Sequence, residues 1–210
     1  MTLAKWGGTA SFVLAAAYII PSMVYLMGDL RSALGPLTYS VADFLYGPAW
    51  AVSLVTAFWA LRAQIGNGTP QRMSWATSAT LFAAAAMIVV ACIRSANRQY
   101  HLAHPDLHLE DSATVLVVWT TIISGLIGAG WHFLGWSLVL LGSAGWTTRR
   151  LPLALSAMYL VAGVMAWLVY VFPDLEGGVV LFGVVVSVWQ GVYLLQAESR
   201  GNHASAQVVV

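Results

Sequence analysis

The chain has 210 residues, of which 60% are hydrophobic and only 8% are charged, and its formal net charge is +1 at pH 7. A soluble domain carries about a quarter charged residues, so this composition excludes an ordinary soluble protein. The small net charge provides no basic field for binding nucleic acid. The single cysteine, Cys92, excludes an intrachain disulfide framework.

Six apolar runs follow one another along the chain, and almost every charged residue lies between them. They cover residues 6–27, 37–61, 75–93, 112–146, 153–172 and 177–196. About 20 apolar residues in a helix cross the hydrocarbon layer, and only helices satisfy their backbone in lipid at this length. The sequence predicts an all-α, polytopic transmembrane bundle of six helices. It forms one domain over 1–196, followed by a disordered cytoplasmic tail over 197–210.

Prolines lie inside the first two runs. Pro21 and Pro48 each remove a backbone donor from a helix interior. We therefore expect a kink in each of these two helices.

The fourth run, 112–146, is too long for a single perpendicular crossing, because about 35 residues form a helix of about 50 Å. Dividing it at residues 128–130 would place Arg149 and Arg150 outside the cell, against the positive-inside rule. We expect one crossing over 129–146, with the apolar segment 112–128 extended over the outer face. That segment either roofs a cavity or is the end of a long helix.

Basic residues divide unequally between the two sides of the membrane. One side holds Lys5, Arg62, Arg72, Arg149, Arg150 and Arg200, and the other holds Arg31, Arg94 and Arg98. The second side also holds Asp29, Asp106, Glu110, Asp111, Asp174 and Glu176. Because loops rich in Lys and Arg stay in the cytoplasm, both termini are predicted to be cytoplasmic.

Three ionisable residues are predicted to reach similar depths in separate spans. Counting 1.5 Å per residue from the inner ends places Asp43 and Arg94 near the outer boundary and His132 in the outer half. Ionisable groups at membrane depth usually face protein or a water-filled cavity. We expect these side chains to converge on a polar pocket open to the outside. The alternative is a structural Asp43–Arg94 ion pair, with His132 bonded to a backbone carbonyl.

Neighbouring side chains extend this candidate pocket. Arg98 shares a helix face with Arg94, one turn further along. Trp131 and Trp136 flank His132 and are able to line an apolar pocket for a lipid or isoprenoid, although core packing is the alternative.

The loop after the third run is rich in metal-ligand side chains. It contains His101, His104, Asp106 and His108, and imidazole and carboxylate groups are typical ligands of divalent metals. The spacing matches no established metal motif, and Pro105 interrupts any helix that would align the histidines. The alternative is a solvated loop in which Asp106 or Asp111 caps the next helix.

Three segments resemble known sequences: GWHFLGW at 130–136, RQYH at 98–101 and FPDLEG at 172–177. They look like segments of uncharacterised bacterial multi-pass membrane proteins. The resemblance implies a helical bundle in a bacterial cytoplasmic membrane, and it supplies no catalytic residue.

These patterns predict an integral membrane protein that binds or moves a small or lipid-like ligand through an outward-facing polar and aromatic pocket. One alternative is a membrane-embedded enzyme that acts on an apolar substrate through a metal or with Asp43 as an acid. Another is an accessory subunit of a larger membrane complex or a homo-oligomer. The lipid bilayer is the one partner that composition dictates.

Overall fold

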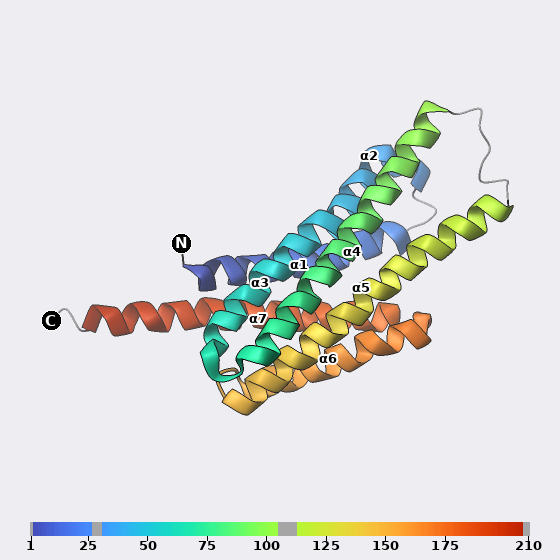
Figure 1. Ribbon diagram of the computed structural model, residues 1–210. Coiled ribbons are helices and arrows are strands. Elements are labelled where there is room, and N and C mark those ends of the chain that lie inside the picture. The colour runs from blue at the N-terminus through green and yellow to red at the C-terminus, as the bar shows by residue number, and fades with distance from the viewer. Residues whose placement is uncertain (1, 27–30, 105–112, 208–210) are drawn as a thin grey trace.

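The protein is an all-helical bundle in a computed structural model that describes residues 2–26, 31–104 and 113–207. Its α-helices are α1 (Leu3–Leu26), α2 (Arg31–Phe44), α3 (Trp50–Ile65), α4 (Pro70–Ala103), α5 (Ala113–Thr148), α6 (Leu153–Val171) and α7 (Glu176–Gln207). Figure 1 shows them packed side by side, with short turns joining α3 to α4, α5 to α6 and α6 to α7.

Six helical segments in the described chain are long and apolar enough to cross a membrane. They are Leu3–Val24, Thr38–Gly68, Pro70–Tyr100, Val117–Thr148, Leu153–Val171 and Pro173–Ser199. The predicted all-α bundle of six spans is confirmed. α7 continues as a helix past the last span to Gln207, and the predicted disorder of the 197–210 tail stays a prediction.

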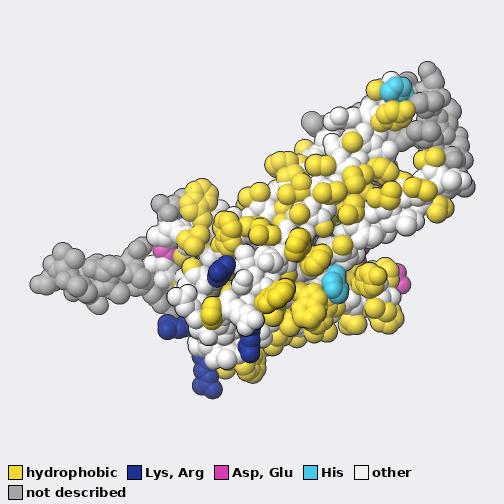
Figure 2. Space-filling view, in the orientation of Figure 1, with side chains coloured by type: hydrophobic (Ala, Val, Ile, Leu, Met, Phe, Trp, Pro, Cys, Tyr) yellow, Lys and Arg dark blue, Asp and Glu magenta, His cyan; other side chains and the backbone are white. Residues whose placement is uncertain are grey.

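Large apolar side chains cover much of the outer surface. Val52, Phe82 and Leu181 are each more than half exposed, and Figure 2 shows such side chains along the whole length of one face. A water-soluble monomer rarely exposes apolar surface on this scale, whereas lipid tails solvate it well.

The second span contains the break that Pro48 predicts. α2 and α3 are joined by a π-helical turn (Leu45–Ala49) that contains Pro48, so the missing donor is accommodated by a wider turn. Gly47 in this turn lies so close to α4 that a Cβ atom would sit 2.2 Å from the Cβ of Ala91. The break therefore lets the second span approach α4 closely. α1, in contrast, continues through its buried Pro21.

α4 and α5 are the longest helices, with 34 and 36 residues against 19 in α6. At 1.5 Å per residue α5 is about 54 Å long, roughly twice the length of α6. Figure 1 shows the C-terminal end of α4 and the N-terminal end of α5 projecting past the ends of α6 and α7. The described part of the 112–128 segment thus extends α5 outward as one continuous helix, and the bundle is not roofed by it.

Small residues allow close backbone contact between α5 and α6. A Cβ on Gly135 would lie 2.8 Å from the carbonyl oxygen of Gly163, and one on Gly163 would lie 2.7 Å from that of Gly135. Such backbone contact is a common means of association in membranes, where burial of apolar surface adds little.

Candidate functional site

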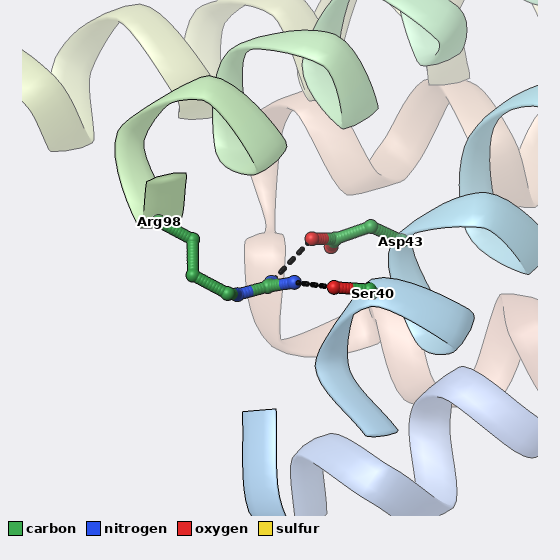
Figure 3. Close-up of polar contacts among 3 residues, drawn as sticks. All are labelled: Ser40, Asp43 and Arg98. Carbon is green, nitrogen blue, oxygen red and sulfur yellow. Dashed lines mark hydrogen bonds and ion pairs between the residues drawn. The ribbon is translucent and has the colours of Figure 1, made fainter. Parts of the chain in front are cut away.

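Asp43 forms a buried ion pair in the second span. We call the half of the bundle that contains this pair the outer half, after its predicted orientation, and the half that contains the α3–α4 and α5–α6 turns the inner half. Its carboxylate accepts a hydrogen bond from Nη2 of Arg98 on α4, and Nη1 of Arg98 donates to the Ser40 hydroxyl at 3.1 Å. Figure 3 shows the guanidinium reaching from α4 to these two side chains of α2. Only 3% of the Asp43 side chain is exposed, against 21% for Arg98. The pair thus joins α2 to α4, and the arginine stays partly exposed.

Two arginines on the same face of α4 also lie over tyrosine rings. Cζ of Arg94 is 5.5 Å from the ring centroid of Tyr46, and Cζ of Arg98 is 5.4 Å from that of Tyr39. Cation–π contacts of this kind are stronger where water is scarce. The structure therefore pairs Asp43 with Arg98, and Arg94 lies one turn away on the same face of α4. The predicted Asp43–Arg94 ion pair stays a prediction.

His132 lies elsewhere, so the expected convergence of three ionisable residues does not occur. Its side chain is exposed on the outside of the bundle, where its ring contacts Phe133 and Tyr170 edge to face. Nε2 of His132 accepts a hydrogen bond from the Trp136 indole at 3.2 Å. Counting residues along α5 estimates the depth of His132 in the membrane but not the direction in which its side chain points. At this level of α5 the buried side chain is that of Trp131.

Trp131 is a core residue. It is 3% exposed, stacks on Tyr18 with ring centroids 6.5 Å apart, and donates through Nε1 to Oε1 of Glu176 at 3.1 Å. Trp50 also packs edge-on against Tyr18, with ring centroids 6.0 Å apart. The three rings belong to one buried cluster, so core packing is the role that the structure gives Trp131.

The proposed metal loop lies mostly outside the described residues. Asp106, His108 and the side chain of His101 are not described. His104 is exposed, stacks on Tyr100 and has Nδ1 3.1 Å from the Tyr100 carbonyl oxygen. Within the described ranges no three His, Cys, Asp or Glu side chains come together as metal ligands.

An aromatic groove on the membrane-facing surface runs between α4 and α5. It has a volume of about 380 Å³ and lies on the side of α4 that faces α5. Its lining residues are Trp75, Ser78, Ala79, Phe82, Phe133, Trp136 and Leu140. We call this the α4–α5 groove. Of the predicted pocket aromatics, Trp136 lies in it and Trp131 does not.

The lining of the groove is almost wholly apolar. Trp136 donates to His132 and packs edge-on against Trp167, with ring centroids 4.7 Å apart. Phe82 and Phe133 contact one another, with ring centroids 5.2 Å apart, and close the groove at the end away from Trp75. The contacts with His132 and Trp167 therefore fix the orientation of the Trp136 ring in the wall of the groove.

A neutral polar network in the inner half of the bundle is the feature that sequence reasoning missed. The Tyr159 hydroxyl donates to Oε1 of Gln190 at 2.7 Å, Nε2 of Gln190 donates to Ser11 at 3.0 Å, and Ser11 donates to the Gly7 carbonyl at 2.7 Å. All three side chains are buried, and they link α6, α7 and α1. The one sequence signal that could have revealed this network is Gln190, a polar residue inside an apolar run.

A small cavity adjoins this network. Its volume is about 40 Å³, enough for about three water molecules, and Ser137 and Ser187 line it beside Tyr159 and Gln190. Ser137 lies 2.6 Å from Thr80 Oγ1, whose own proton goes to the Ala76 carbonyl. Ligand pockets typically have volumes of 300–1,000 Å³, so the α4–α5 groove has the size of a ligand site and this cavity does not.

No family model matches the chain, and neither a curated protein nor a solved structure matches it. The resemblance of three segments to bacterial multi-pass proteins stays a prediction. The function of the protein is therefore inferred from its geometry.

Proposed function

We propose that this integral membrane protein binds a lipid-like ligand, with an apolar chain lying in the α4–α5 groove. The observation that carries the proposal is the groove itself, which opens on the membrane-facing surface and has aromatic side chains on both walls. A lipid chain reaches such a site from the bilayer without crossing water.

The groove has the length and lining expected of a chain-binding site. Trp75 and Phe82 lie seven residues apart on α4, as do Phe133 and Leu140 on α5, so each wall covers about two helical turns, or about 10 Å. Exposed Ser78 and buried Ala79 are small residues on α4, which leaves room between the aromatic walls.

Two observations favour binding over movement of the ligand. The interior cavity, at about 40 Å³, is too small for a lipid chain. Tyr18 lines this cavity and packs against Trp50 and Trp131 in one buried cluster, which leaves no wide path through the bundle core in the described residues. The ion pair also gives Asp43 a structural role in joining α2 to α4, in place of the acid role of the enzyme alternative.

Filling the groove tests the proposal. Ser78→Trp places a bulky ring in the groove from an exposed position, and Ser124→Trp is the matched control at an exposed serine on the outer part of α5. Native mass spectrometry in mild detergent counts bound phosphatidylcholine. We expect at least about a fivefold loss of bound lipid in Ser78→Trp and none in the control.

Photo-crosslinking with a diazirine-labelled phosphatidylcholine gives a second measurement that needs no variant. Labelled peptides are expected to contain residues 75–82 or 133–140. Equal lipid retention in both tryptophan variants, together with labelling spread evenly over the lipid-facing helices, would overturn the proposal.

We also propose that the protein lies in a bacterial cytoplasmic membrane with both termini in the cytoplasm. The support is the charge distribution: the α3–α4 and α5–α6 turns and the helix ends beside them carry basic residues and no acidic ones, namely Arg62, Arg72, Arg149 and Arg150. Fusion of green fluorescent protein to the C-terminus is expected to fluoresce, and fusion of alkaline phosphatase there is expected to be inactive. The reverse result would contradict this orientation.

A further inference from the structure

Arg72 lies at one end of the α4–α5 groove. It is an exposed residue of α4, three positions before Trp75, and its Nη1 donates to the Thr147 hydroxyl on α5 at 3.2 Å. Thr147 lies seven positions after Leu140, which lines the groove. The Arg72–Thr147 bridge therefore joins the same two helices immediately beyond the end of the groove.

This end of the groove is at the level of the lipid headgroups. Trp75 and Trp146 are both about half exposed or more and lie near the ends of their spans, where tryptophan side chains mark the interface of the bilayer. Arg72 comes just before Trp75, so its guanidinium lies outside the hydrocarbon layer while the groove lies within it. A lipid whose chain fills the groove has its phosphate close to Arg72.

The charge at this end is positive. Residues 44–105 and 112–173 contain no Asp or Glu, so both turns at this end of the bundle carry only basic side chains. Figure 2 shows most of the Lys and Arg side chains on the visible face gathered at the end of the bundle where these turns lie. The Arg72 guanidinium has five N–H donors, and among the described residues it gives one of them to Thr147.

From this geometry we infer that the ligand of the groove is an anionic phospholipid from the leaflet at the Arg72 end. This inference depends on the proposed function and adds the class of headgroup. The phosphate group accepts hydrogen bonds from Arg72, whose planar guanidinium suits a phosphate. The acyl chain lies against the aromatic walls of the groove.

A comparison of headgroups on identical acyl chains tests the inference. Native mass spectrometry compares binding of phosphatidylglycerol with that of phosphatidylcholine to the full chain, for wild type, Arg72→Gln and Arg62→Gln. Arg62 is the matched control because it lies at the same level but bonds to Thr77 on another side of α4, away from the groove. One basic residue near a membrane surface changes the affinity for an anionic lipid by about fivefold.

We expect wild type and Arg62→Gln to prefer phosphatidylglycerol by about fivefold, and Arg72→Gln to lose this preference while still binding phosphatidylcholine. Equal binding of the two lipids by wild type, or an unchanged preference in Arg72→Gln, would overturn the headgroup assignment and leave the groove proposal standing. Failure of the groove proposal is recognised separately, by full lipid retention in Ser78→Trp.

Discussion

The outer and inner halves of the bundle hold their helices together with different polar chemistry. Near the outer boundary, the charged Asp43–Arg98 pair joins α2 to α4. In the inner half, the neutral groups of Tyr159, Gln190 and Ser11 join α6, α7 and α1. A charge is least costly near the bilayer edge, where water still reaches part of the side chain, whereas deep in the bundle neutral groups that satisfy one another avoid the cost of desolvating an ion.

Loss of the Asp43 carboxylate is expected to have the largest effect on stability. Asp43→Asn leaves the Arg98 guanidinium without its ion partner and should lower the free energy of unfolding by about 2–3 kcal/mol, less than for a fully buried pair because Arg98 is partly exposed. Unfolding in mixed SDS micelles measures this difference.

A double-mutant cycle shows whether the loss belongs to the pair. Asp43→Asn with Arg98→Gln should recover at least about 1 kcal/mol relative to the sum of the single changes. Asp43→Asn with Arg62→Gln is the control and should be additive, because Arg62 bonds to Thr77. Additivity in both cycles would show that Asp43 and Arg98 are not energetically coupled.

Loss of the Gln190 amide is expected to have a smaller effect. Gln190→Leu removes its hydrogen bonds to Tyr159 and Ser11 and should lower the free energy of unfolding by about 1–2 kcal/mol, since hydrogen bonds between membrane helices average well under 1 kcal/mol each. Gln196→Leu, at an exposed position on the same helix, is the matched control and should change little. Equal effects of the two substitutions would show that the network adds no stability.

Salt concentration is expected to have the smallest of these effects on the free energy of unfolding. It should distinguish the charged pair in the outer half from the neutral network in the inner half. Raising NaCl from 0.05 to 1 M should reduce the effect of Asp43→Asn by a few tenths of a kcal/mol, because Arg98 is partly exposed and the ions screen the pair. The effect of Gln190→Leu should stay the same, because neither partner is charged. A salt dependence of equal size in both variants would contradict the contrast between the two halves.

The same contrast explains what the sequence could predict. Apolar run length was sufficient for the six spans, and a carboxylate and two arginines among apolar residues were conspicuous enough to identify the outer cluster. Arg98 was not expected as the ion partner of Asp43, because Arg94 and Arg98 share a helix face one turn apart and the π-helical turn (Leu45–Ala49) alters the approach of α2. Depth counting cannot make that distinction.

The sequence also did not predict in which direction each side chain points around its helix axis. His132 was expected to face the pocket, but the inward side chain on α5 is the neighbouring Trp131, about 100° away around the axis. The Gln190 network was missed because its members are neutral and lie within apolar runs. The α4–α5 groove was found only in part, through Trp136, because it depends on which faces of two helices meet.

The most direct test of the central claim is a cryo-electron microscopy map of the protein in nanodiscs that contain phosphatidylglycerol and phosphatidylcholine. The account predicts elongated density for an acyl chain in the α4–α5 groove, against Trp75, Phe82 and Trp136, with a headgroup next to Arg72. A groove closed by its own side chains, or one without density while ordered lipid lies elsewhere on the surface, would contradict it.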